Sequence, residues 1–230
     1  MRTIASWAPD RRGFLVAGAS AVVLAGCSNM IGPGRMPQLY VLHPKLGPLA
    51  DAPNVGWQLA VALPSAPQSL DTTRIALELT PQTMDYYANA SWEDRAPVIV
   101  QRTLLEGFEK SGKIAAVARD TGAMRGDYIL QSDLRAFGAR YETPDTAPMV
   151  VVDISAKLLR TPGREIVATL QARHTAQASV NSVPAVVAAF DQALGETAEQ
   201  IVAWALTAPP TPEAEKPASR RRHHRRRHRR

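Results

Sequence analysis

The chain has 230 residues, of which 45% are hydrophobic and 21% charged, and its formal net charge is +6. This length allows one domain with an ordinary core and terminal extensions, and the apolar fraction excludes a wholly disordered chain. The positive charge is concentrated at the C-terminus, because residues 220–230 contain eight arginines, three histidines and no acid. Residues 27–219 hold 16 Lys and Arg against 20 Asp and Glu. The body of the protein is therefore mildly acidic, which argues against a nucleic-acid-binding domain.

Residues 1–26 have the pattern of a signal peptide. A basic stretch with Arg2, Arg11 and Arg12 precedes the apolar run Phe14–Ala25. That run is too short to cross a hydrocarbon core of roughly 30 Å, which needs about 20 residues, but it suits the apolar segment of an export signal. The chain is therefore predicted to leave the cytoplasm.

The apolar run ends in a sequence that resembles the lipobox of bacterial lipoproteins, Leu24-Ala25-Gly26-Cys27. Small residues suit the peptidase that cuts before the cysteine, and the thiol of Cys27 accepts diacylglycerol. Cys27 is the only cysteine, so no intramolecular disulfide competes for it. The resemblance predicts a membrane anchor of two or three acyl chains such as palmitate. A spare cysteine behind an ordinary signal is the alternative.

Two sequence features bear on the export route and on the membrane that the protein reaches. Arg11 and Arg12 resemble a twin-arginine signal, but adjacent arginines also occur in ordinary Sec signals, so both routes stay open. By resemblance to enterobacterial sorting, Ser28 in place of Asp favours the outer membrane over the inner membrane. The expected location is the periplasm, on a membrane anchor.

Composition divides the mature chain into three parts. Residues 27–37 form the lipidated cysteine and a Gly- and Pro-containing tether. Residues 38–206 form the folded domain, and residues 207–230 form a Pro- and Ala-rich linker followed by the Arg- and His-rich tail. No internal repeat is present.

The folded part predicts strands that alternate between apolar and polar residues, and two helices. Strands are expected at residues 38–43, 57–63, 73–79, 114–118, 127–139, 148–159 and 165–179, with a turn or short strand at 81–88. Helices are expected at 95–113, with Asp94 as N-cap, and at 183–206, with Ser182 as N-cap and Pro184 in the first turn.

The three long strands each have one apolar face and one polar face. The apolar faces carry Tyr128, Leu130 and Leu134; Val150, Val152, Ile154 and Leu158; and Ile166, Ala168 and Leu170. The polar faces carry Gln131, Asp133 and Arg135; Asp153, Ser155 and Lys157; and Thr169, Gln171 and Arg173. One buried and one wet sheet face with two amphipathic helices predict an α+β fold, a two-layer α/β sandwich with a largely antiparallel sheet and both helices on one face.

Several motifs, in this order behind a lipobox, resemble the ABC-type transport auxiliary lipoproteins, the group that includes the PqiC-like proteins. They are Leu39-Tyr40-Val41-Leu42, Arg74-Ile75, Tyr86-Tyr87 leading to Trp92, Leu104-Leu105 with Phe108, and Asp127-Tyr128-Ile129-Leu130 with Leu134 and Phe137. The resemblance covers about residues 38–206. Two departures are the proline after the tryptophan, displaced here to Pro97, and the Arg-rich tail.

The resemblance implies an accessory role beside ABC or MCE-type systems that move phospholipids or other hydrophobic compounds across the envelope. The permease, the ATPase and the MCE protein would be separate chains, and the lipoprotein itself is a possible homo-oligomer. Consistent with this, the sequence has no Gly-rich phosphate loop, no Gly-x-Ser-x-Gly elbow and no His-Glu-x-x-His pair. His43 and His174 are the only histidines outside the tail, and His174 is expected to be a hydrogen-bonded core residue. The sequence predicts no enzyme, no cofactor and no metal site.

The tail offers a second kind of contact. Its arginines are Arg220, Arg221, Arg222, Arg225, Arg226, Arg227, Arg229 and Arg230. They predict binding to an anionic envelope surface, at roughly 1 kcal/mol per arginine near an anionic leaflet, and the alternative is a solvated segment without a ligand. Export makes nucleic acid an improbable partner in the cell. The alternative overall function is a structural lipoprotein that bridges the membrane and an anionic polymer through this tail.

Overall fold

The computed structural model describes residues 36–122 and 126–208, and those of the described residues that follow Met36 form one compact unit. Eight strands and two helices lie in these residues. The strands are β1 (Gln38–Tyr40), β2 (Val55–Val61), β3 (Arg74–Thr80), β4 (Thr83–Trp92), β5 (Ile114–Arg119), β6 (Tyr128–Arg140), β7 (Met149–Arg160) and β8 (Glu165–Gln177). The helices are α2 (Ala96–Ser111) and α3 (Val183–Thr207). The predicted α+β class is confirmed.

One mixed sheet contains all eight strands. Its long ladders, β6 with β7 and β7 with β8, are antiparallel, as is the β3–β4 hairpin. Four shorter ladders are parallel: β1–β4, β2–β5, β2–β6 and β3–β6. The segment from β2 to β3 follows one edge of β6, where Ser65 bridges to Asp133 between the two ladders. The largely antiparallel character of the long strands is as predicted. Two of the four parallel ladders, β2–β6 and β3–β6, form because β2 and β3 pair one after the other with the same edge of β6.

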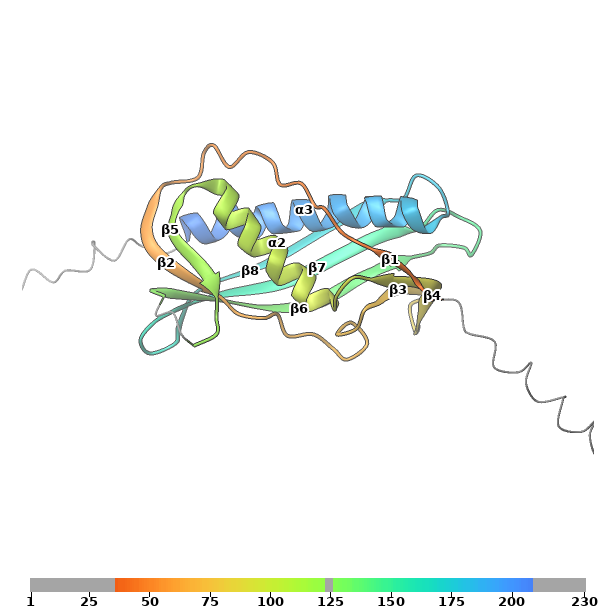
Figure 1. Cartoon of the computed structure of the whole chain (residues 1–230), viewed down its shortest axis with the longest axis horizontal. Coiled ribbons are helices and arrows are strands. Elements are labelled where there is room, and N and C mark those ends of the chain that lie inside the picture. Colours follow the sequence, from red (N-terminus) through yellow and green to blue (C-terminus); the bar gives the residue numbers. More distant parts are fainter. Residues whose placement is uncertain (1–35, 123–125, 209–230) are drawn as a thin grey trace, which may run out of the picture. The chain divides into compact units, whose positions relative to one another are not determined.

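Both helices pack on the same face of the sheet (Figure 1). The backbone N–H of Ala185 donates to the hydroxyl of Ser182 at 3.4 Å, which confirms Ser182 as the N-cap of α3. The prediction of Asp94 as N-cap of α2 is wrong. Arg95 holds that position without a side-chain cap, and α2 starts at Ala96 with Pro97 next in its first turn, which suits the fixed φ of proline.

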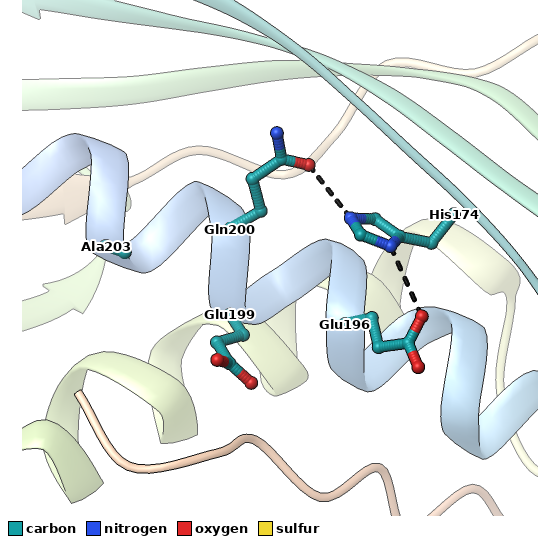
Figure 2. A pocket seen from close by; sticks show the side chains of 5 residues that line it. All are labelled: His174, Glu196, Glu199, Gln200 and Ala203. Carbon is teal, nitrogen blue, oxygen red and sulfur yellow. Dashed lines mark hydrogen bonds and ion pairs between the residues drawn. The ribbon is translucent and has the colours of Figure 1, made fainter.

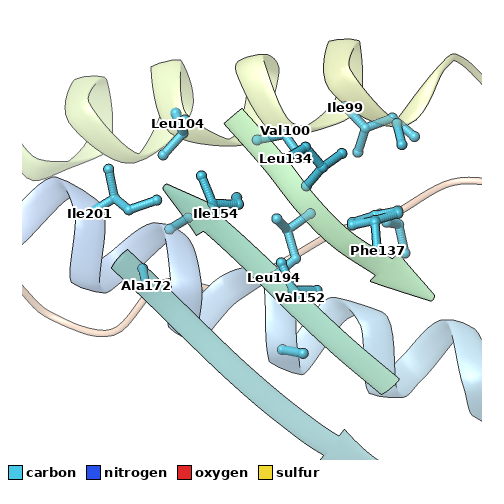
Figure 3. Packing of buried hydrophobic residues seen from close by; sticks show 14 of the residues in the cluster. Ile99, Val100, Leu104, Leu134, Phe137, Val152, Ile154, Ala172, Leu194 and Ile201 are labelled. Carbon is cyan, nitrogen blue, oxygen red and sulfur yellow. The ribbon is translucent and has the colours of Figure 1, made fainter. Parts of the chain in front are cut away.

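The core fills the space between the helices and the sheet (Figure 3). Val100 of α2, Leu134 of β6 and Ile154 of β7 are fully buried there. Trp92, at the end of β4, stands edge-on to Phe190 of α3, with ring centroids 5.0 Å apart. Trp92 is therefore a core residue. Aromatic pairs of this geometry add to the area that they bury.

Two bulges change which residues face the helices. On β6, Leu134 pairs with Ile154 and Ala136 with Asp153, so Arg135 is the extra residue. This bulge returns Phe137 to the helix side, where it is 2% exposed. On β8 the ladder slips at the level of Leu158 and Leu159. Ile166 is therefore 52% exposed, and its predicted place in the core is wrong.

An extended connection, residues 41–54, crosses both helices on its way from β1 to β2 (Figure 1); we call it the strap. Its backbone N–H at His43 donates to Asp191 of α3 at 2.6 Å, and its N–H at Gly47 donates to Glu199 at 2.7 Å. Leu42 of the strap is buried in the core. The strap therefore fixes the outer side of α3 with two charge-assisted hydrogen bonds.

Candidate functional site

The predicted site residues lie outside the described part of the chain. These are Cys27 with Leu24, Ala25 and Gly26; Arg11 and Arg12; and the tail arginines of residues 220–230. Lipidation, export and anionic-surface binding at these positions stay predictions. Across residues 36–122 and 126–208, no helix is both long and apolar enough to span a bilayer.

His174 lies at the boundary between the edge strand β8 and α3 (Figure 2). Its Nε2 is 2.9 Å from Oε1 of Gln200, and its Nδ1 is 3.2 Å from a carboxylate oxygen of Glu196. The predicted hydrogen bonding is confirmed, but the ring is a boundary residue with a side chain 32% exposed, not a core one. No group of three metal-ligating side chains occurs in the described ranges. The ring therefore serves to join β8 to α3.

Two open hollows lie on the described surface. One, of about 240 Å³, is lined by His174, Glu196, Glu199, Gln200 and Ala203. The other, of about 200 Å³, is lined by Glu78, Thr80, Pro81, Arg140 and Tyr141. Ligand pockets usually enclose about 300–1,000 Å³ and are mostly apolar. Both hollows are open and smaller than this range, so neither has the size to enclose a lipid chain.

The sheet face opposite the helices carries paired charges on its three long strands. Asp133 and Arg135 of β6 are 3.6 Å apart, and so are Asp153 of β7 and Arg173 of β8. The side chain of Asp153 is only 8% exposed and also accepts a hydrogen bond from Gln171 at 3.3 Å. This surface, which we call the open sheet face, is polar as predicted, with one carboxylate more deeply buried than a wet face implies.

A chain of polar groups joins three elements beyond the end of β6. The hydroxyl groups of Tyr87 and Tyr141 are 2.7 Å apart, and Tyr141 donates to Oδ1 of Asn181 at 2.9 Å. Burial raises the pKa of the Tyr87 hydroxyl far above its usual range, and the hydrogen bond with Tyr141 and their Coulombic interaction raise it further. Tyr87 therefore stays protonated and acts as a structural link between β4 and the loop after β6.

The Tyr87–Tyr141–Asn181 link was not predicted from the sequence. Its members lie up to 94 positions apart, and the sequence signals only that Tyr87 belongs to an aromatic pair near a turn. The strap hydrogen bonds of Asp191 and Glu199 were also missed. From the sequence alone, acidic residues on the polar side of an amphipathic helix are expected to be exposed to solvent rather than bonded to another segment.

Comparison with known proteins adds sequence and structural relatives. A model of the family described as ABC-type transport auxiliary lipoprotein component matches residues 40–202. The uncharacterized protein bll6063 of Bradyrhizobium diazoefficiens is 30% identical over 190 residues, which are 81% of this chain and 50% of that protein. This chain thus spans about half the length of that curated relative.

Two crystal structures resemble the fold. Protein XCC0632 from Xanthomonas campestris, of the DUF330 family model, is 35% identical with a TM-score of 0.69, and the match covers 74% of this chain and 94% of that one. A second uncharacterized protein is 13% identical with a TM-score of 0.57 over 73% of this chain and 97% of its own, which supports the fold alone. The family match covers most of the chain, from β1 to the last turns of α3. The chain therefore belongs to the family of ABC-type transport auxiliary lipoprotein components.

Proposed function

We propose that the chain is a periplasm-facing lipoprotein, anchored through Cys27, that serves as an accessory subunit of an ABC or MCE-type transporter. The cargo is phospholipid or another hydrophobic compound, and the permease, the ATPase and the MCE protein are separate chains. Ser28 favours the outer membrane as the site of the anchor. The protein has no catalytic step of its own and needs no cofactor in this role.

Family membership carries the proposal, and the filled core defines the kind of accessory. A protein that ferries lipid by itself needs an enclosed apolar cavity, whereas the two hollows described above are open and have volumes of only about 240 and 200 Å³. The domain therefore acts as a docking part rather than as a carrier.

The open sheet face is our candidate for the surface that docks on the transporter. Neither helix covers it, and it carries both signs of charge on neighbouring strands. Interfaces of this kind draw specificity from matched charges more than from apolar area. Lys157 lies exposed in the middle of this face, on β7.

Recovery of the transporter with this chain tests the docking surface. Lys157→Glu should lower the amount of permease and MCE protein that co-purifies after crosslinking in native membranes. Lys110→Glu on α2 is the matched control, because Lys110 is exposed and paired only within its helix, with Glu106 at 2.9 Å. Equal recovery with both variants would remove the open sheet face from the proposal.

Genetics and lipid transfer test the function. Deleting the gene should give the same envelope-permeability defect as deleting the partner transporter, with no further loss in the double deletion. The purified chain should transfer little fluorescent phospholipid between vesicles. Robust transfer by the chain alone would contradict a docking role.

The eight arginines of the tail favour one second candidate. A structural lipoprotein that bridges the membrane and an anionic polymer needs such a cationic segment and no transporter. Two results together would favour this bridging role. The double deletion would show an additive defect, and a copy of the gene that lacks residues 220–230 would fail to rescue the single deletion.

A further inference from the structure

Exposed apolar side chains gather at one end of the domain. Among the described residues of 37–122 and 126–208, eight large apolar side chains are between 41% and 60% exposed. Six of them belong to β1, the first residue of the strap, the β3–β4 hairpin, the start of β7 and the turn before α3: Leu39, Val41, Leu79, Met84, Met149 and Val180. We call this surface the apolar end. Leu63 and Ile166 are the two that lie elsewhere.

The first four of these residues lie on three neighbouring strands or directly after one of them, Leu39 and Val41 beside the last residues of β4, and Leu79 and Met84 at the β3–β4 turn. β1 pairs with β4, with Leu39 opposite Ser91, and β4 pairs with β3. The hairpin between β3 and β4 closes at Thr80 and Thr83, and Leu79 and Met84 flank this closing pair. The three strands lie side by side at the end of the sheet where the described chain begins (Figure 1).

Hydrogen bonds and one ion pair join Met149 and Val180 to the same end. Met149 pairs with Arg140, whose guanidinium is 2.7 Å from Glu78 of β3. The N–H of Ala178, two residues before Val180, donates to the carbonyl of Pro148 at 3.0 Å. Figure 1 shows the β6–β7 loop and the turn before α3 at this end, away from the β7–β8 hairpin that carries Ile166.

The covalent path to Cys27 decides what this end can reach. Single exposed apolar residues are ordinary, but a group of them marks an interaction surface. Nine residues lie between Cys27 and Pro37, which makes ten residue-to-residue steps, and an extended chain spans at most about 3.3–3.6 Å per step, so the tether reaches roughly 35 Å. It enters the domain at β1, on the apolar end itself. We propose that the apolar end rests on the bilayer that holds the lipid anchor; this rests on the lipidation proposed at Cys27.

The charges at the apolar end indicate whether its contact with the bilayer depends on anionic lipid. Glu142 and Asp145, in the β6–β7 loop, and Asp85, on β4, are exposed. Arg140 is neutralised by Glu78. A surface with apolar and acidic groups gains nothing from anionic lipid, so it enters the headgroup region by apolar contact. Binding by the Arg-rich tail would require anionic lipid, so vesicles of zwitterionic lipid report on the apolar end alone.

Quenching by brominated phosphatidylcholine tests the proposal in the full-length lipidated chain. Met84→Trp and Val180→Trp place reporters on the apolar end, and Ile166→Trp is the matched control, because Ile166 is equally exposed at the far end. The native tryptophans are the same in all three variants. In zwitterionic vesicles we expect the added emission to be quenched at positions 84 and 180 and unchanged at 166, with no effect of salt.

Each other outcome has a definite meaning. If the chain floats with the vesicles but positions 84 and 180 are not quenched, or all three are quenched equally, the proposed orientation is wrong. If the chain does not float, lipidation at Cys27 has failed. The free Cys27 thiol is then coupled to a maleimide lipid, which restores the same tether, and the quenching comparison decides the orientation as before.

Discussion

The carbonyl oxygen of Lys45 lies 2.5 Å from the position that a Cβ would occupy on Gly195. The strap therefore passes so close to α3 that only glycine fits beneath it. Gly107 of α2 has the same role, because its Cβ would stand 2.6 Å from Leu46 of the strap and 3.1 Å from Val202 of α3. Two glycines inside helices thus allow the strap and both helices to pack in contact.

Gly195→Ala should destabilise the domain. Alanine gains about 1 kcal/mol of helix propensity over glycine, but overpacking against a backbone atom costs about 1–3 kcal/mol, and a carbonyl cannot rotate away as a side chain can. We expect a net loss of up to about 2 kcal/mol in the free energy of unfolding, measured by chemical denaturation. Gly56→Ala is the control, since no atom lies within 4 Å of its Cβ position. Equal stability of the two variants would show that the strap moves aside freely.

The partly buried carboxyl of Asp191, which accepts the hydrogen bond from the His43 N–H, predicts that the stability of the domain depends on pH. Burial raises the pKa of the Asp191 carboxyl above its ordinary value of 3.8, and the bond from the His43 N–H and the charges of His43 and Lys45 oppose this shift. Between pH 3.8 and the raised value the folded chain holds more protons than the unfolded chain, so stability falls as pH rises through this window.

Two substitutions at Asp191 separate charge from hydrogen bonding. Asp191→Asn keeps an acceptor for the His43 N–H and removes the titration, so it should abolish this part of the pH slope and not destabilise the chain at pH 7. Asp191→Ala leaves the N–H without its acceptor and should cost about 0.5–1.5 kcal/mol at every pH. Denaturation between pH 3 and pH 7 measures both. A marked loss of stability in the Asn variant at pH 7 would mean that the carboxylate charge itself stabilises the strap.

The main features of the fold could be predicted from the periodicity of apolar residues and from the N-cap residue of α3. Apolar and polar residues alternate on β6 and β7 up to Leu134 and Ile154, and these strands pack as alternation predicts. The pattern failed where a ladder slips by one residue. A bulge inverts the facing of every later position, so Phe137 and Ile166 each took the face opposite to the one that strict alternation gives. No local residue type announces such a slip.

Contacts between segments far apart in sequence account for the rest of what sequence reasoning could not supply. Glu199 bonds to a residue 152 positions away, and Tyr87 to one 54 positions away. Residue type predicts that such groups need partners but does not identify them. The predicted lipid-attachment motif is the reverse case, because the prediction at Cys27 rests on the immediate neighbours of that residue and on no tertiary contact.

Ser132→Ala should stabilise the domain or leave it unchanged. The hydroxyl of Ser132 is buried on the helix side of β6 and has no hydrogen-bond partner within the described residues. A buried hydroxyl without a partner costs about 1–3 kcal/mol, so its removal should add up to about 1 kcal/mol once the lost contact is counted. Ser65→Ala is the matched control, because that hydroxyl donates to Asp133 at 3.0 Å and its loss should destabilise. A stability loss in Ser132→Ala would reveal a partner for that hydroxyl, such as a buried water.

The export route is tested by charge-preserving changes at the paired arginines. Arg11→Lys together with Arg12→Lys keeps the basic character of the signal but removes the guanidinium pair that twin-arginine export requires. Precursor should then accumulate in the cytoplasm, as followed by pulse-chase labelling. Normal maturation of the double variant would assign the segment to the Sec route, which tolerates lysine.

Anchoring is tested at Cys27. The thiol is the only one in the chain, so Cys27→Ala removes the sole acceptor for diacylglycerol and also the residue before which the lipoprotein peptidase cuts. The variant should take up no alkyne fatty acid, keep residues 1–26 and run at a higher mass than the native protein. Cys27→Ser is the closest control in size, and it should behave in the same way, because a hydroxyl does not replace the thiol in this transfer. Labelling of either variant at the native level would place the lipid elsewhere, and the anchor at Cys27, with the tether that starts from it, would have to be abandoned.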